Sequence, residues 1–263
     1  MNPDDDTPIA RTARLALACL DLTRLNEGDT EADIAQLCER AQGPHGAVAA
    51  VCVWPRLAAH ARSLLPPHIA VAAVANFPDG GSDLQRAVRD TAEIVAAGAQ
   101  EVDVVIPWRD LAAAPALLAA VRRAGASLRL KVILETGELQ TAALIRQASR
   151  IALDAGADFL KTSTGKTPRS ASPEAARVML EAIAGDPRGR NHVGFKASGG
   201  IRTVADAARY INLTAEVLGT AAVKPARFRL GASGLLDDIE ALLSGTARPT
   251  HVSAGTSPGP GPY

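Results

Sequence analysis

Short apolar runs alternate along the chain with longer amphipathic stretches. This alternation is typical of βα units around a parallel sheet, whose strands are buried on both faces. The runs that predict strands lie at residues 18–22, 47–53, 69–75, 101–106, 128–135, 158–161, 193–196 and 228–230. Eight such strands in one chain favour a closed barrel.

The amphipathic stretches between these runs predict helices at residues 30–42, 55–65, 82–97, 109–124, 138–155, 173–184, 203–213 and 235–244. An extra helix is predicted at 7–18, ahead of the first strand. Capping residues stand at several predicted starts: Ser82, Ser172 before Pro173, and Thr203 three residues before Asp206. The predicted fold class is therefore α/β, a single (β/α)8 barrel of the TIM type over residues 1–244 with an extra N-terminal helix.

The last stretch, residues 245–263, has the sequence GTARPTHVSAGTSPGPGPY, which is rich in Pro, Gly, Ser and Thr. Such a composition buries too little apolar surface to order a chain, so we predict a mobile, flexible C-terminal tail. A coil of this length spans about 25 Å, enough for transient visits to the barrel mouth. Two interpretations of Tyr263 stay open, a proton-transfer group and a solvated chain end.

Composition narrows the classes of function. Lys and Arg number 28, as do Asp and Glu, so no overall positive field attracts nucleic acid or an anionic membrane. Aromatic residues make up 3%, too few for base-stacking platforms. No apolar run approaches the roughly 20 residues of a membrane span, and the acidic N-terminus is unlike a secretory signal. We expect a soluble, cytoplasmic protein that acts on a small molecule.

Motifs for metals and cofactors do not occur in the sequence. Cys19, Cys38 and Cys52 lack the C-x-x-C spacing of zinc sites and are expected to be buried free thiols. The five histidines are scattered, and there is no H-E-x-x-H or P-loop pattern. We therefore expect no metal and no cofactor.

Two lysines stand at the ends of consecutive predicted strands, Lys161 in DFLKTSTGK and Lys196 in HVGFKASGG. In a barrel they share one corner of the mouth, where the βα loops converge. Burial and a neighbouring like charge lower the pKa of an amine, which makes it a nucleophile near neutral pH. The pair indicates Schiff-base chemistry; the alternative is that both lysines are structural partners of buried carboxylates.

Strand alternation in EVDVVIPW places Glu101, Asp103 and Val105 on one face. If this face points inward, Asp103 lies opposite the two lysines and could pass protons or act only as a counter-ion. Lys131, in the middle of a predicted strand, is expected to form a structural ion pair.

Glycine-rich turns follow the last three predicted strands. They contain Gly165 and Lys166, Gly199 and Gly200, and the GASG run with Ser233 and Gly234. Glycines allow close approach of the backbone, and barrels often bind phosphate at the loops after strands seven and eight. With Lys166 as a point charge, these turns favour phosphate binding over plain turns.

The motifs EVDVVIP, KVILETGEL, GADFLKTSTGK, VGFKASGGIRT and RFRLGAS follow one another in this order, and the chain from CLDLTRLN to RFRLGASG resembles the deoxyribose-phosphate aldolase family. The resemblance implies a metal-independent class I aldolase, a lyase on a (β/α)8 barrel. Members cleave 2-deoxy-D-ribose 5-phosphate reversibly to D-glyceraldehyde 3-phosphate and acetaldehyde. It implies that Lys161 forms the Schiff base, that Lys196 tunes it and assists proton transfer, and that Asp103 is the third member of the group.

Further roles are implied by the same resemblance. The phosphate would contact Gly165, Lys166, Gly199, Gly200, Ser233 and Gly234. Asp21 and Thr23 would lie at the mouth and shape a small aldehyde pocket with Cys52, for which plain packing is the alternative. Gly234 stands where the family commonly has a second serine, and the lost hydroxyl could weaken phosphate binding by about 1.5–3 kcal/mol. A homodimer is common in the family.

Two other functions stay open from the sequence alone. The same barrel could carry another Schiff-base aldolase or a sugar-phosphate isomerase, because fold does not fix function. A sugar-phosphate sensor without catalytic activity is the second alternative.

Overall fold

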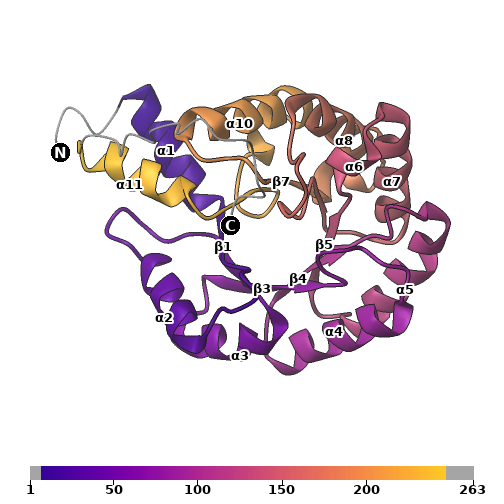
Figure 1. The fold of residues 1–263 in the computed structure, drawn as a ribbon. Coiled ribbons are helices and arrows are strands. Elements are labelled where there is room, and N and C mark those ends of the chain that lie inside the picture. Colours follow the sequence, from indigo (N-terminus) through magenta and orange to yellow (C-terminus); the bar gives the residue numbers. More distant parts are fainter. Residues whose placement is uncertain (1–6, 247–263) are drawn as a thin grey trace.

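In the computed structural model, which describes residues 7–246, eight parallel strands pair in chain order and the last closes onto the first (Figure 1). The strands are β1 (Leu20–Thr23), β2 (Ala50–Val53), β3 (Ala70–Ala75), β4 (Glu101–Val105), β5 (Arg129–Ile133), β6 (Phe159–Lys161), β7 (Gly194–Ser198) and β8 (Phe228–Ala232). Each lies where the apolar runs predict it, with ends shifted by a few residues. The predicted barrel is confirmed.

Helices form a ring outside the barrel (Figure 1). The long ones are α2 (Glu31–Arg40), α3 (Pro55–Leu64), α4 (Leu84–Ala96), α5 (Ala114–Ala124), α7 (Ala142–Asp154), α8 (Pro173–Gly185), α10 (Val204–Leu218) and α11 (Leu235–Leu243). The predicted extra helix is α1 (Pro8–Ala18), which packs against α10 and α11. Ser172 and Thr203 cap α8 and α10 as predicted.

Four of the helices differ from the prediction at their boundaries. The helix expected at 138–155 is split into α6 (Thr136–Leu139) and α7, because Gln140 has a φ of 60° and cannot continue a helix. Asp83, not Ser82, caps α4, since its carboxylate accepts the amide proton of Arg86. The helix expected at 109–124 begins with a 3₁₀ turn, η2 (Leu111–Ala113), and α10 runs five residues past its expected end at 213.

Two further short elements, α9 (Gly189–His192) and η3 (Thr220–Ala222), connect helices to strands without a signal in the hydrophobic pattern. A single turn is too short for a periodicity to appear.

The apolar residues form two clusters separated by the wall of strands. The larger cluster lies between the strands and the ring of helices, and it takes Val102 and Val104 from β4. The smaller cluster lies inside the barrel, at the carboxyl ends of the strands: Leu25, Cys52, Ala72, Val74, Phe77, Val105 and Ile133. Strand alternation thus places Val105 and Asp103 on the inward face of β4, as predicted.

The barrel and its helices occupy the residues from Pro8 to Leu243. Most of the predicted tail, including Tyr263, lies outside the described residues. Within residues 7–246, no helix has both the length and the apolar character needed to cross a membrane.

Candidate active site

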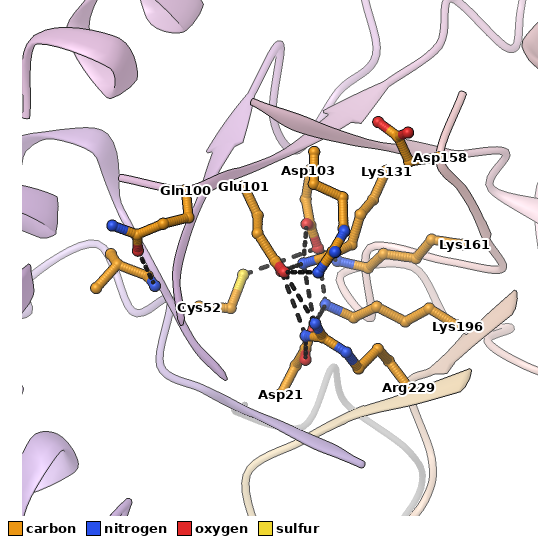
Figure 2. A network of polar contacts seen from close by, with 12 residues as sticks. Asp21, Cys52, Gln100, Glu101, Asp103, Lys131, Asp158, Lys161, Lys196 and Arg229 are labelled. Carbon is orange, nitrogen blue, oxygen red and sulfur yellow. Dashed lines mark hydrogen bonds and ion pairs between the residues drawn. The ribbon is translucent and has the colours of Figure 1, made fainter. Parts of the chain in front are cut away.

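Charged side chains from several strands converge inside the barrel (Figure 2). They are Asp21 on β1, Glu101 and Asp103 on β4, Lys131 on β5, Lys161 on β6, Lys196 on β7 and Arg229 on β8. None is more than 3% exposed. Four cations therefore share three carboxylates, so the position of each carboxylate decides which cation keeps its proton.

Asp103 joins the two predicted catalytic lysines. Its Oδ2 lies 2.8 Å from Nζ of Lys161 and 2.8 Å from Nζ of Lys196. The two lysines are register partners on the neighbouring strands β6 and β7, which brings their side chains to the same height in the barrel. The structure thus places the three predicted residues around one carboxylate oxygen.

The two lysines have unequal surroundings. Nζ of Lys196 also lies 2.6 Å from Oδ2 of Asp21, whereas Asp103 is the carboxylate paired with Lys161. Burial, and then the charge of Lys196, lower the pKa of Lys161 against the opposing effect of Asp103. Burial also lowers the pKa of Lys196, but Asp103 and Asp21 outweigh it, so this pKa is raised. The expected mutual lowering therefore holds for Lys161 and is wrong for Lys196.

Asp21 does not lie at the mouth, where the sequence places it. It is fully buried in the middle of the barrel, and its carboxylate contacts Lys131, Lys196 and Arg229. It is therefore a counter-ion within the charged network. Thr23 is the next inward residue of β1, and its hydroxyl donates to the carbonyl of Asp21 at 2.9 Å.

Lys131 and Arg229 are the two cations of this network for which no catalytic role is predicted. Nζ of Lys131 lies 2.5 Å from Glu101, 2.9 Å from Asp103 and 3.0 Å from Asp21, so the predicted structural ion pair is present three times over. Arg229 binds Asp21 at 2.6 Å and Glu101 at 2.9 Å. Sequence reasoning missed Arg229, although an arginine inside the buried strand FRLGA is a signal that could have found it.

Replacing Arg229 with Met is expected to lower the free energy of unfolding by about 3–5 kcal/mol, because two buried carboxylates lose a partner. Arg177→Met is a matched control, since Arg177 bonds Glu216 through both nitrogens on the surface, where water screens the pair. Urea unfolding of both variants measures the difference. Equal, small changes in the two variants would contradict the structural role of Arg229.

Cys52 forms part of the apolar wall above the charged network. Its Sγ lies 3.9 Å from Oδ2 of Asp103, and burial together with that charge raises the pKa of the thiol. The wall continues with Phe77, whose ring meets Trp54 edge to face at a centroid distance of 5.5 Å. Cys19, Cys38 and Cys52 are all buried and unpaired, as predicted. Among residues 7–246, no group of three or more His, Cys, Asp or Glu could hold a metal ion.

The predicted phosphate turns lie side by side after β6, β7 and β8. Gly165, Gly199 and Gly200 have φ values of 76°, 85° and 77°, a region that favours glycine. A Cβ on Gly199 would come within 3.3 Å of Cα of Gly165, so these two turns touch. Gly234 precedes α11 as its N-cap residue, and Ser233 borders a cavity of about 150 Å³ next to Thr23.

Lys166 extends from the first of these turns. It is half-buried, and burial lowers its pKa, while Asp29 and Glu27 on the loop after β1 oppose this effect. Its backbone amide donates to Oγ1 of Thr164 at 3.0 Å. The ammonium group thus lies within the field of two carboxylates at the same end of the barrel.

Gly231 leaves room for Lys196. A Cβ at this position would lie 2.9 Å from Cε of Lys196 and would overlap Oγ of Ser198. Gly231→Ala is expected to lower the free energy of unfolding by about 1–3 kcal/mol through overpacking. Gly185→Ala is the control, because nothing lies within 4 Å of its added Cβ. Equal urea midpoints for the two variants would contradict this prediction.

Two serines escaped the sequence reasoning. Oγ of Ser163 and Oγ of Ser198 are buried and have no hydrogen-bond partner within the described part of the chain. Each follows a lysine by two residues, in the sequences Lys161-Thr-Ser and Lys196-Ala-Ser. This spacing was the available signal, because residues two apart on a strand share a face. Buried hydroxyls without partners are suited to a substrate's polar groups.

The chain is similar to known aldolases over most of its length. Residues 15–236 match the family model of DeoC/LacD family aldolases. The chain is 46% identical over 251 residues to a deoxyribose-phosphate aldolase of Agrobacterium fabrum, covering 92% of this chain and 95% of that protein. A candidate deoxyribose-phosphate aldolase from Coccidioides immitis has 29% identity and a TM-score of 0.75, covering 87% of both chains. One from Toxoplasma gondii has 25% identity and a TM-score of 0.79, covering 90% of this chain and 96% of its own.

Proposed function

The chain belongs to the DeoC/LacD family of aldolases, and we propose that it is a class I deoxyribose-phosphate aldolase. It cleaves 2-deoxy-D-ribose 5-phosphate reversibly to D-glyceraldehyde 3-phosphate and acetaldehyde. The observation that carries this proposal is the pair of lysines on one oxygen of Asp103, of which one has a lowered and the other a raised pKa.

The reaction begins with the neutral amine of Lys161. Its lone pair attacks the aldehyde carbon of the open-chain sugar and forms a carbinolamine. Loss of the carbinolamine hydroxyl as water requires a proton, which the charged Lys196 supplies, with Asp103 as the bridge between the two amines. The product is an iminium ion on Lys161.

The iminium ion then draws electrons from the bond between C2 and C3. The hydroxyl on C3 loses its proton as that bond breaks and glyceraldehyde 3-phosphate leaves, and Asp103, directly or through water, passes the proton back to the neutral amine of Lys196. The remaining enamine takes a proton at its terminal carbon from Lys196 and returns to an iminium ion. Addition of water releases acetaldehyde and restores the amine of Lys161.

The rest of the mouth suits this substrate. The inward apolar cluster, which includes Cys52, would form the apolar wall against the two-carbon donor, together with the buried Thr23. The glycine turns and Lys166 bind the phosphate at a distance from the reacting carbons. Binding energy gained there orients the chain for cleavage. Asp21 forms an ion pair with Lys196 and thereby keeps that lysine charged.

The test is to supply 2-deoxy-D-ribose 5-phosphate to the purified protein and to measure acetaldehyde release with an NADH-coupled alcohol dehydrogenase. Stoichiometric acetaldehyde and glyceraldehyde 3-phosphate are expected. Conversion to another sugar phosphate without acetaldehyde would indicate an isomerase. Binding without turnover would indicate a sensor, and a different donor product would indicate another aldolase.

Three finer points belong to the same proposal. Three buried free thiols suit a reducing compartment, which supports a cytoplasmic location.

The homodimer is supported by the family resemblance, and light scattering of the purified protein tests it. The proton-transfer role of Tyr263 is supported by the reach of the tail; deletion of residues 245–263 without loss of kcat would overturn it.

A further inference from the structure

Glu135 is a buried carboxylate that the proposed reaction does not use. It follows β5 at the mouth of the barrel and is fully buried. Its backbone is left-handed, with φ 56° and ψ 58°, a conformation that non-glycine residues seldom adopt and that is concentrated at functional positions. Its side chain contacts the loop after β6.

The carboxylate of Glu135 receives hydrogen bonds from that loop. The backbone amide of Thr164 donates to both oxygens, at 3.3 and 3.2 Å. The hydroxyl of Thr164 donates to Oε2 at 2.5 Å, and that of Thr167 lies 3.4 Å from Oε1. Burial raises the pKa of Glu135, and the bonds from Thr164 oppose this rise. The amide and the hydroxyl of Thr164 donate to this carboxylate, whereas the hydroxyl of Thr167 directs its proton to the carbonyl of Arg169 at 2.9 Å.

The hydroxyl of Thr164 connects Glu135 to the next residues of the loop through a second hydrogen bond. Because its proton is directed at Glu135, its lone pairs are left for the backbone amide of Lys166, which donates to it at 3.0 Å. Gly165 lies between them with its φ of 76°, against the turn at Gly199. One carboxylate therefore fixes the turn at residues 164–166, which is the first of the three phosphate turns.

The position of Lys161 does not depend on the contacts of Glu135. It belongs to β6, and its amine is bound by Asp103. Thr162, the residue after it, is tied to β7 through its hydroxyl, which accepts the amide of Ser198 at 2.9 Å. Loss of the Glu135 contacts should therefore disturb the turn and leave the amine in place.

We propose that Glu135 is a positioning residue that shapes the turn at residues 164–166 into a cradle for the substrate phosphate. It thereby sets the preference for 2-deoxyribose 5-phosphate over unphosphorylated 2-deoxyribose. This inference rests on the proposed function.

The test compares both sugars with Glu135→Gln, whose amide keeps the size of the side chain but turns a donor toward the amide of Thr164. We expect KM for 2-deoxyribose 5-phosphate to rise about tenfold, equal to about 1.4 kcal/mol, with kcat changed less than about twofold. The value of kcat/KM for 2-deoxyribose should stay the same. Glu138→Gln, on the half-buried glutamate one turn away, is the matched control and should behave as wild type.

A second pair of variants repeats the test if Glu135→Gln fails to fold. Thr164→Val removes the linking hydroxyl and should raise KM for the phosphorylated sugar in the same way, and Thr164→Ser should restore it. Equal losses for the two sugars, or no change for either, would overturn the positioning role. So would a wild-type protein that cleaves both sugars equally well. A wild-type protein that releases acetaldehyde from neither sugar would overturn the proposed function itself.

Discussion

Lys161→Met is expected to lower kcat for cleavage of 2-deoxy-D-ribose 5-phosphate by at least about 10⁴-fold, because the nucleophile of the reaction is lost. Lys196 cannot replace it, since Asp103 and Asp21 raise its pKa and hold its proton. The fold should persist, because Asp103 keeps its contacts to Lys131 and Lys196. Steady-state release of acetaldehyde measures the loss.

The control for this variant is Lys224→Met, an exposed lysine that precedes β8 at the opposite end of the barrel. It removes the same charge and should leave kcat unchanged. A Lys161→Met protein with more than about 1% of wild-type kcat would contradict the assignment of the nucleophile.

Lys196→Met is expected to lower kcat by about 10²–10³-fold and to shift the acidic limb of the pH profile to higher pH. The charge of Lys196 helps burial to lower the pKa of Lys161. Its removal raises that pKa, and Asp103, with one cation fewer, attracts the proton of Lys161 more strongly. Only the unprotonated amine attacks the substrate, so activity appears at higher pH than in wild type.

Lys196→Arg tests the effect of the positive charge apart from the donation of a proton. Arginine keeps the positive charge near Lys161 but gives up no proton in this pH range. Its kcat should fall, while its acidic limb should stay close to that of wild type. The profile of kcat/KM against pH for the three proteins measures this. A limb that stays in place or moves downward in Lys196→Met would contradict the electrostatic coupling between the lysines.

The barrel could be predicted because strands buried on both faces leave a clear pattern of apolar runs. The break between α6 and α7 could not, because Gln140 adopts a positive φ without the glycine or proline that usually marks such a break. The short α9 and η3 lie between elements with no periodicity of their own. Local pattern thus defines the long elements and misses turns that tertiary packing imposes.

The candidate site was predictable to the extent that alternation along single strands determines it. Lys161, Lys196 and Asp103 meet as the inward positions of β4, β6 and β7 predict. The depth of Asp21 was predicted wrongly, because the stagger between strands sets which residues share a height, and no single strand reveals it. Glu135 was missed for a related reason, since its role depends on a loop 29 residues further along the chain.

The unequal basicity of the lysines has the same origin. Their sequence contexts are alike, and the difference comes from Asp21, which stands 175 residues before Lys196 in the chain. A charge pair of this separation has no local signature.

The Schiff-base mechanism is tested most directly by incubating the protein with acetaldehyde, reducing with borohydride and mapping the ethyl adduct by peptide mass spectrometry. We expect an adduct on Lys161 and none on Lys196. An adduct on Lys196 alone would reverse the roles of the two lysines, and no adduct on either would contradict the Schiff-base mechanism.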